Sequence, residues 1–73
     1  MDVIAAEIRT EDMSQGKYDE QVAWCIKNFG PQARFKDHVD DDRPWLNEYS
    51  LGGYWWWYFA REEYATLFAL RWL

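Results

Sequence analysis

The sequence has little of what usually stabilises a very small domain. Among its 73 residues there is one cysteine, Cys25, so no intramolecular disulfide is possible, and no spaced set of cysteines and histidines indicates structural zinc. A chain of this size must then be held by burial of apolar side chains, helped by oligomerisation or a partner. We interpret residues 1–73 as a single domain, with Cys25 as a buried rather than a reactive thiol.

Long apolar runs and basic charge are also scarce. No apolar stretch approaches the roughly 20 residues of a membrane span, and the N-terminus lacks the basic and apolar regions of a signal peptide, so we expect a cytoplasmic protein with no membrane partner. Eight Lys and Arg against 13 Asp and Glu give a net charge of −5. This charge disfavours nucleic acid as a partner. It suits a basic protein partner, or simply keeps the protein in solution.

Patterns for catalysis and cofactor binding are missing. The only histidine, His38, and Cys25 fall on different expected elements, and Ser14 and Ser50 have no nucleophile-elbow context. The pair at residues 52–53 is the only Gly-Gly, and no Gly-Lys-Ser/Thr follows it as in a phosphate-binding loop. We therefore predict a protein that is not an enzyme and carries no cofactor.

Aromatic residues, in contrast, are abundant. They make up 21% of the chain, and six of them are consecutive at residues 54–59, "YWWWYF". Each can bury roughly 150–250 Å². Aromatic side chains favour strands, and no polar residue interrupts this run, so it predicts a strand. Alternate side chains of a strand point to opposite sides, so both faces of this one would be aromatic.

The N-terminal part of the chain predicts a strand and then a helix. Residues 3–9 alternate so that Ile4, Ala6 and Ile8 share one face, as in a half-buried strand, and residues 10–20 form a polar loop that leads into the helix. Asp19 and Glu20 would lie in the first turn of that helix, where the dipole favours acids. Its apolar stripe consists of Tyr18, Val22, Ile26 and Phe29.

The end of this helix is marked by two residues. Gly30 can take the positive φ of a C-terminal cap, and Pro31 cannot continue the helix.

The middle of the chain has two interpretations. Residues 32–39 alternate, with Ala33, Phe35, Asp37 and Val39 on one face, and predict an edge strand. Residues 45–50 could form another strand, joined to residues 54–59 by a tight hairpin at the Gly-Gly pair. The alternative is one wide loop over residues 40–53.

Residues 61–73 return to helical spacing, with acids at the start and Arg71 near the end, as the helix dipole favours. The stripe consists of Tyr64, Leu67 and Phe68, flanked by Ala65, Ala69 and Trp72. Two helices of about three turns can cover one face of a small sheet. The predicted fold is α+β: a small two-layer sandwich with a three- or four-stranded antiparallel sheet and two helices on one face, in the order β-α-β-(β)-β-α.

The uncovered side of this sheet is the predicted partner-binding surface. Exposed apolar patches and Trp or Tyr side chains often mark interaction sites, although residues 40–50 could instead fold over that side. Pairing with residues 45–51 does not decide which set of aromatics faces the core, and we assign the exposed side to the Trp55 set. The predicted partner-binding residues are Trp55, Trp57, Phe59, Trp45, Asp40, Asp41 and Asp42.

The aspartates of this set belong to "KDHVDDD", residues 36–42. Hard cations prefer oxygen ligands, so calcium or magnesium binding is one interpretation. The spacing does not match an EF-hand loop, which needs a central glycine and a distal glutamate. We interpret the run as a solvated acidic loop that offers negative charge to a basic partner, and we predict no metal site.

Three segments together resemble a group of small, mostly uncharacterised proteins of tailed bacteriophages. They are "WCIKNFGP" at the end of the first helix, "YWWWYFA" in the aromatic strand, and the closing "REEYATLFALRWL". The similarity covers about residues 23–73. Its shared residues have the character of core and cap positions, so it implies no catalytic role: Trp24, Asn28, Gly30, Phe68, Leu70 and Trp72.

The resemblance implies a phage-encoded protein in the cytoplasm of a bacterial host, and two functions compete there. The first is a module that binds and modulates or inhibits a host protein, for example one of an anti-phage defence. The second is a virion or assembly component that self-associates through its aromatic sheet face. The expected partner is thus a host or phage protein, or a second copy of the chain.

Overall fold

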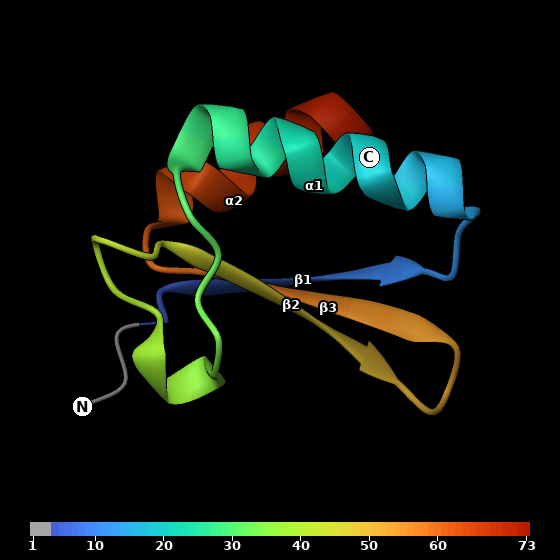
Figure 1. Ribbon diagram of the computed structural model, residues 1–73, viewed down its shortest axis with the longest axis horizontal. Coiled ribbons are helices and arrows are strands. Elements are labelled where there is room, and N and C mark those ends of the chain that lie inside the picture. Colours follow the sequence, from blue (N-terminus) through green and yellow to red (C-terminus); the bar gives the residue numbers. More distant parts are fainter. Residues whose placement is uncertain (1–3) are drawn as a thin grey trace.

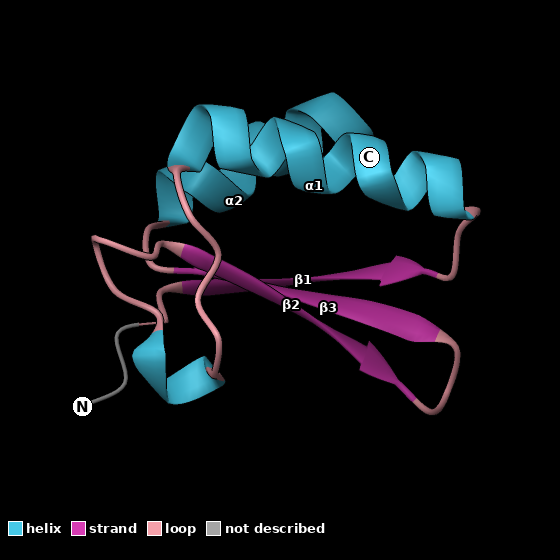
Figure 2. Cartoon of the chain, viewed as in Figure 1, coloured by secondary structure: helices cyan, strands magenta, loops and turns pink. Residues whose placement is uncertain are grey.

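The computed structural model describes residues 4–73, which form a three-stranded antiparallel sheet with two helices on one face (Figures 1 and 2). The elements are β1 (Ala6–Glu11), α1 (Gln15–Phe29), the 3-10 helix η1 (Lys36–His38), β2 (Trp45–Ser50), β3 (Tyr54–Phe59) and α2 (Glu62–Trp72). The strand order is β1-β3-β2. The predicted α+β sandwich is therefore confirmed, with three strands in the order β-α-β-β-α. Val3, the expected start of the first strand, lies outside the described residues.

A tight hairpin joins β2 to β3, as the Gly-Gly pair predicts. The Gly53 N–H donates to the Ser50 carbonyl at 3.0 Å, and Gly53 has a φ of 87°, which only glycine adopts without strain. The two strands pair over their whole length, from Trp45 opposite Phe59 to Ser50 opposite Tyr54. The alternative of a wide loop over residues 40–53 is wrong.

Helix α1 begins earlier than its apolar stripe predicts. Ser14 caps it, because its Oγ accepts the Lys17 N–H at 3.3 Å, and Asp19 and Glu20 therefore lie beyond the first turn. The predicted end is confirmed: Gly30 has a φ of 113°, and its N–H donates to the Ile26 carbonyl at 3.1 Å.

The buried face of α1 also differs from the predicted stripe. Ile26 is 52% exposed, whereas Gln21 and Cys25 are buried. The reason is the neighbouring helix: Trp24 contacts the rings of Phe68 and Trp72 on α2, and this packing turns the buried face of α1 away from Ile26.

The main core lies between the sheet and the helices. Its buried residues are Cys25, Trp45, Trp57, Phe59, Ala65 and Phe68. The ring of Phe68 lies 4.7 Å from that of Trp57 and 5.4 Å from that of Phe59, centroid to centroid. The indole N–H groups of these two tryptophans are paired, that of Trp57 with Thr10 Oγ1 and that of Trp45 with the Gly30 carbonyl, each at 2.9 Å. Burial of these rings therefore leaves no indole donor of Trp45 or Trp57 unpaired.

The predicted strand over residues 32–39 is wrong. Gln32 makes one isolated bridge to Trp45, and the chain then continues as a loop that contains η1 on the sheet face opposite α1 and α2 (Figure 1). We call this face, which no α-helix covers, the helix-free face. Ala33 and Val39 are buried there, but Phe35, expected on the same side, is 63% exposed. The segment packs on the sheet through the side chains of Ala33 and Val39 and does not form a strand.

Ile4 also differs from its expected position. It packs in a second cluster on the helix-free face, against buried residues that include Leu46 and Tyr58. Ala6 and Ile8 pack on the main core. The ladder is irregular at this point, because the Ala5 N–H donates to the Phe59 carbonyl at 2.9 Å rather than to its direct partner.

None of the described helices combines the length and the apolar character that a membrane crossing requires.

Candidate partner-binding surface

The assignment of the two faces of β3 is the opposite of the predicted one. Trp57 and Phe59 have no exposed surface, and Trp55 is partly buried between the rings of Tyr18 and Tyr49, at 4.6 and 5.2 Å. The expectation that Trp55, Trp57 and Phe59 form the exposed side is therefore wrong. Trp45, expected to bind a partner, is also fully buried.

The pairing of β1 with β3 gives the physical reason. Ile8 lies opposite Trp57 and points to the helices with it, whereas Arg9 lies opposite Trp56 on the other side. Glu7 and Glu11 share that other side. Charged groups need water, so they keep this face from being the dry core. The alternation of charged and apolar residues in β1 shows in the sequence which face of that strand is exposed to water. It identifies the exposed face of β3 only when the register between the two strands is known.

The helix-free face is closed at one end. There the side chain of Tyr58 is buried under the 31–44 segment, and the Lys36 ammonium lies 4.7 Å from its ring centroid. Burial, a hydrogen bond to Glu48, and the negative charges of Glu48 and Glu7 raise the pKa of Tyr58 to about 12. This half of the sheet face is part of the folded body, and the ring of Tyr58 is not available to a partner.

The other end of the face, toward the hairpin, is open (Figure 1). We call the residues there the open patch: Arg9, Glu11, Glu48, Tyr54 and Trp56. Tyr54 and Trp56 are partly exposed. The Arg9 guanidinium lies 4.4 Å from the centroid of the Tyr54 ring, and Glu48 lies opposite Trp56 on β2. A tryptophan, a tyrosine and an arginine are thus adjacent on a rigid strand pair.

The acidic run is arranged around its own backbone. Asp40 Oδ1 accepts the N–H groups of Asp42 and Arg43, each at 2.9 Å, and Asp41 pairs with Arg61 at 3.2 Å. In the part of the chain that the structure describes, no three His, Cys, Asp or Glu side chains are grouped to hold a metal ion. Asp40, Asp41 and Asp42 remain exposed, but they lie in the 31–44 segment and outside the open patch.

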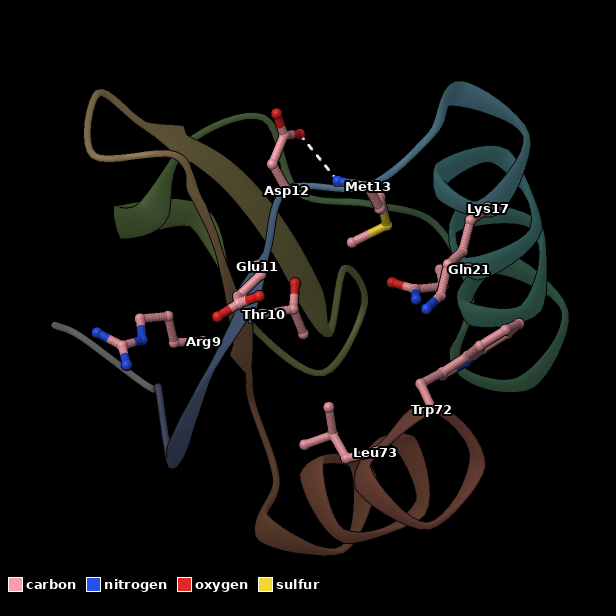
Figure 3. A pocket seen from close by; sticks show the side chains of 9 residues that line it. All are labelled: Arg9, Thr10, Glu11, Asp12, Met13, Lys17, Gln21, Trp72 and Leu73. Atoms are coloured by element: carbon pink, nitrogen blue, oxygen red, sulfur yellow. Dashed lines mark hydrogen bonds between the residues drawn. The ribbon is translucent and has the colours of Figure 1, made fainter.

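A cavity of about 450 Å³ lies at the outer side of β1 (Figure 3). It was not predicted from the sequence. Its lining residues are Arg9, Thr10, Glu11, Asp12, Met13, Lys17, Gln21, Trp72 and Leu73. Gln21 is only 2% exposed and its Oε1 has no hydrogen-bond partner. One feature of the sequence could have indicated the cavity: Gln21 lies at helical spacing from Tyr18 and Cys25, on a helix face that is otherwise apolar.

The remaining reactive group, Cys25, is enclosed in the main core. Burial raises the pKa of its thiol to about 12, which keeps it protonated at neutral pH. The interpretation of Cys25 as a buried thiol is confirmed.

No family model, curated protein or solved structure matches the chain.

Proposed function

We propose that the protein is a small acidic protein-binding module that contacts its partner through the open patch. One observation carries the proposal: Arg9, Tyr54 and Trp56 lie together on the sheet face opposite α1 and α2 (Figure 2). Trp, Tyr and Arg are the residues most enriched at the energetic centres of protein interfaces. Strands β1 and β3 hold the backbone of all three, so little backbone entropy is lost when they bind.

The charges of the patch support a protein partner over a nucleic acid. Glu11 and Glu48 lie opposite the two aromatic side chains, on either side of β3. Surfaces that stack bases pair their aromatics with Lys and Arg along the phosphate track. Carboxylates in those positions would repel phosphates, whereas they can pair with basic side chains at the rim of a protein interface.

The proposed setting follows from the resemblance to small proteins of tailed bacteriophages. The partner is then a host protein in the cytoplasm of an infected bacterium, and binding modulates or inhibits it. The protein acts by occupying a surface and has no catalytic step.

Affinity capture from a bacterial lysate tests the proposal. We expect the wild-type protein to retain a defined partner and the Tyr54→Ala/Trp56→Ala variant to retain at least tenfold less, measured by quantitative mass spectrometry. The matched control is Leu67→Ala/Leu70→Ala, which removes two exposed apolar side chains from α2 and should retain the partner fully. Equal recovery by all three proteins would exclude the open patch as the binding surface.

Light scattering coupled to size exclusion examines the alternative, a self-associating virion or assembly component. The proposal expects a monomer. A stable oligomer that the Tyr54→Ala/Trp56→Ala variant abolishes would assign the open patch to self-association instead.

A further inference from the structure

The outer edge of β1 is open. Among the described residues, only β3 pairs with this strand along its length. The Asp12 N–H donates to the Gly53 carbonyl at 3.0 Å. Because backbone groups alternate in direction along an antiparallel strand, Thr10 then bonds toward β3, and the N–H and C=O groups of Arg9 and Glu11 point outward. These unpaired groups can accept another strand.

The arrangement of the elements leaves room for such a strand. The order β1-α1-β2-β3-α2, with β3 between β1 and β2, is that of a split β-α-β unit followed by a helix. In the six-element form of this topology, a fourth strand lies beside β1. In the described part of this chain, no strand occupies that position, and the cavity opens next to it on the helix side.

The cavity contains a buried group that lacks a partner. Gln21 reaches it from α1, and Figure 3 shows its amide pointing into the space between the helices and Thr10. Its Oε1 is an acceptor with no donor, and the buried Nε1 of Trp72, another lining residue, is a donor with no acceptor. Buried polar groups are normally paired, so these two atoms are available to a polar group that enters the cavity.

We propose that the open edge of β1 binds an extended segment of the partner protein as a fourth strand. One side chain of that segment enters the cavity and donates a hydrogen bond to Gln21 Oε1. The inference rests on the proposed function, since it assumes that the protein binds a protein partner. It uses the backbone edge of β1 and the cavity on the helix side, whereas the open patch uses side chains on the opposite face, two of which, Arg9 and Glu11, come from the same strand. Backbone pairing supplies affinity in this mode, and pockets for alternate side chains supply specificity.

A strand added to the edge of β1 would point side chains into the cavity. A strand paired with β1 sends every second side chain toward the helix layer, on the same side as Thr10. The cavity lies on that side of β1, between α1 and the end of α2 (Figure 3).

The charged lining indicates the kind of side chain that fits. The Arg9 and Glu11 side chains leave β1 on the opposite face. The charges on the cavity side are therefore those of Lys17 and Asp12, one of each sign, and the site favours neither an anion nor a cation. The entering group is therefore an uncharged donor, which a Ser, Thr, Asn or Gln side chain supplies.

A displayed library of random ten-residue peptides, selected on the wild-type protein, tests the proposal. We expect enriched peptides with an extended pattern and a Ser, Thr, Asn or Gln at one fixed position. Glu11→Pro should weaken their binding at least tenfold, because it removes one outward N–H and leaves the ladder to β3 intact. Glu11→Ala, the matched control, should bind within about twofold of wild type. Gln21→Leu should abolish the preference at the fixed position.

Hydrogen exchange provides a readout on the unmodified protein. In the free protein the amides of Arg9 and Glu11 should exchange rapidly and those of Ile8 and Thr10 slowly. An enriched peptide should protect Arg9 and Glu11 at least tenfold. Absence of enrichment, equal binding by Glu11→Pro and Glu11→Ala, or no new protection at this edge would overturn the proposal.

The open patch serves as the second control. Tyr54→Ala/Trp56→Ala should leave peptide binding at the edge unchanged. Peptides that lose binding in this variant but not in Glu11→Pro would overturn the edge proposal and leave the proposed function standing. If partner capture is unaffected by both Tyr54→Ala/Trp56→Ala and Glu11→Pro, the proposed function is overturned. The peptide experiment then decides by itself whether the β1 edge binds an extended segment.

Discussion

Adjacent residues on α2 have opposite surroundings. Phe68 has no exposed surface and contacts the rings of Trp24, Trp57 and Phe59, whereas Leu67 is 50% exposed. The value of an apolar side chain to stability depends on the contacts and area that it buries. Two neighbouring apolar residues of one helix therefore contribute very differently to the stability of the folded protein.

We predict that Phe68→Ala lowers the free energy of unfolding by about 3–5 kcal/mol, because it removes a large ring from a closed core and leaves a cavity. Leu67→Ala should change it by less than about 1 kcal/mol. Urea titrations followed by tryptophan fluorescence measure both. A loss of similar size in the two variants would contradict the packing of α2.

Two glycines in different elements have opposite requirements. Gly53 has a φ of 87° in the turn between β2 and β3. Gly16 lies in the first turn of α1, has no positive φ, and has no atoms within 4 Å of the position that a Cβ would occupy. The first uses the conformational freedom of glycine, and the second does not.

We therefore predict that Gly53→Ala destabilises the protein by about 1 kcal/mol, because an L side chain is strained at positive φ. Gly16→Ala should stabilise it by about 0.5–1 kcal/mol, because alanine loses less backbone entropy in a helix. Thermal unfolding followed by circular dichroism should show melting temperatures that move in opposite directions. Shifts of the same sign would disagree with one of the two backbone assignments.

At the scale of the whole molecule, stability should fall at alkaline pH. Two buried acids have raised pKa values in the folded state: Cys25, from 9.0 to about 12, and Tyr58, from 10.0 to about 12. Between these values the unfolded chain releases protons that the folded protein retains. Raising the pH from 9 to 12 therefore favours unfolding, whereas neither group changes stability below about pH 8.

We expect a loss of about 1 kcal/mol per pH unit for each group within its range, starting at a lower pH for Cys25. Urea unfolding at pH values from 7 to 11 measures the slope. The Cys25→Ala/Tyr58→Phe variant, which removes both titrating groups, should have a flatter profile between pH 9 and 11 whatever its stability at pH 7. An unchanged slope would show that these two groups are not responsible.

The elements and the surfaces of this protein differ in how far the sequence predicts them. Paired strands at residues 45–50 and 54–59 were one of two interpretations of the sequence, and the structure has both strands with these bounds. The open patch was not expected, because Trp56 has the same local pattern as Trp55 and Trp57. The cavity at Gln21 was missed for a related reason: its walls come from β1, α1 and the end of α2, which are distant in sequence.

By itself the sequence determined the features that depend on neighbouring residues. These include the aromatic strand, the hairpin at Gly53, the cap at Gly30 and the second helix, each set by local propensity or by a required backbone angle. The tertiary structure alone decided which aromatics are buried and which edge is open. Those outcomes depend on the register of Ile8 opposite Trp57 and on the packing of α2 beside α1. Contacts between such distant residues follow from the packing of the whole chain, and no local pattern specifies them.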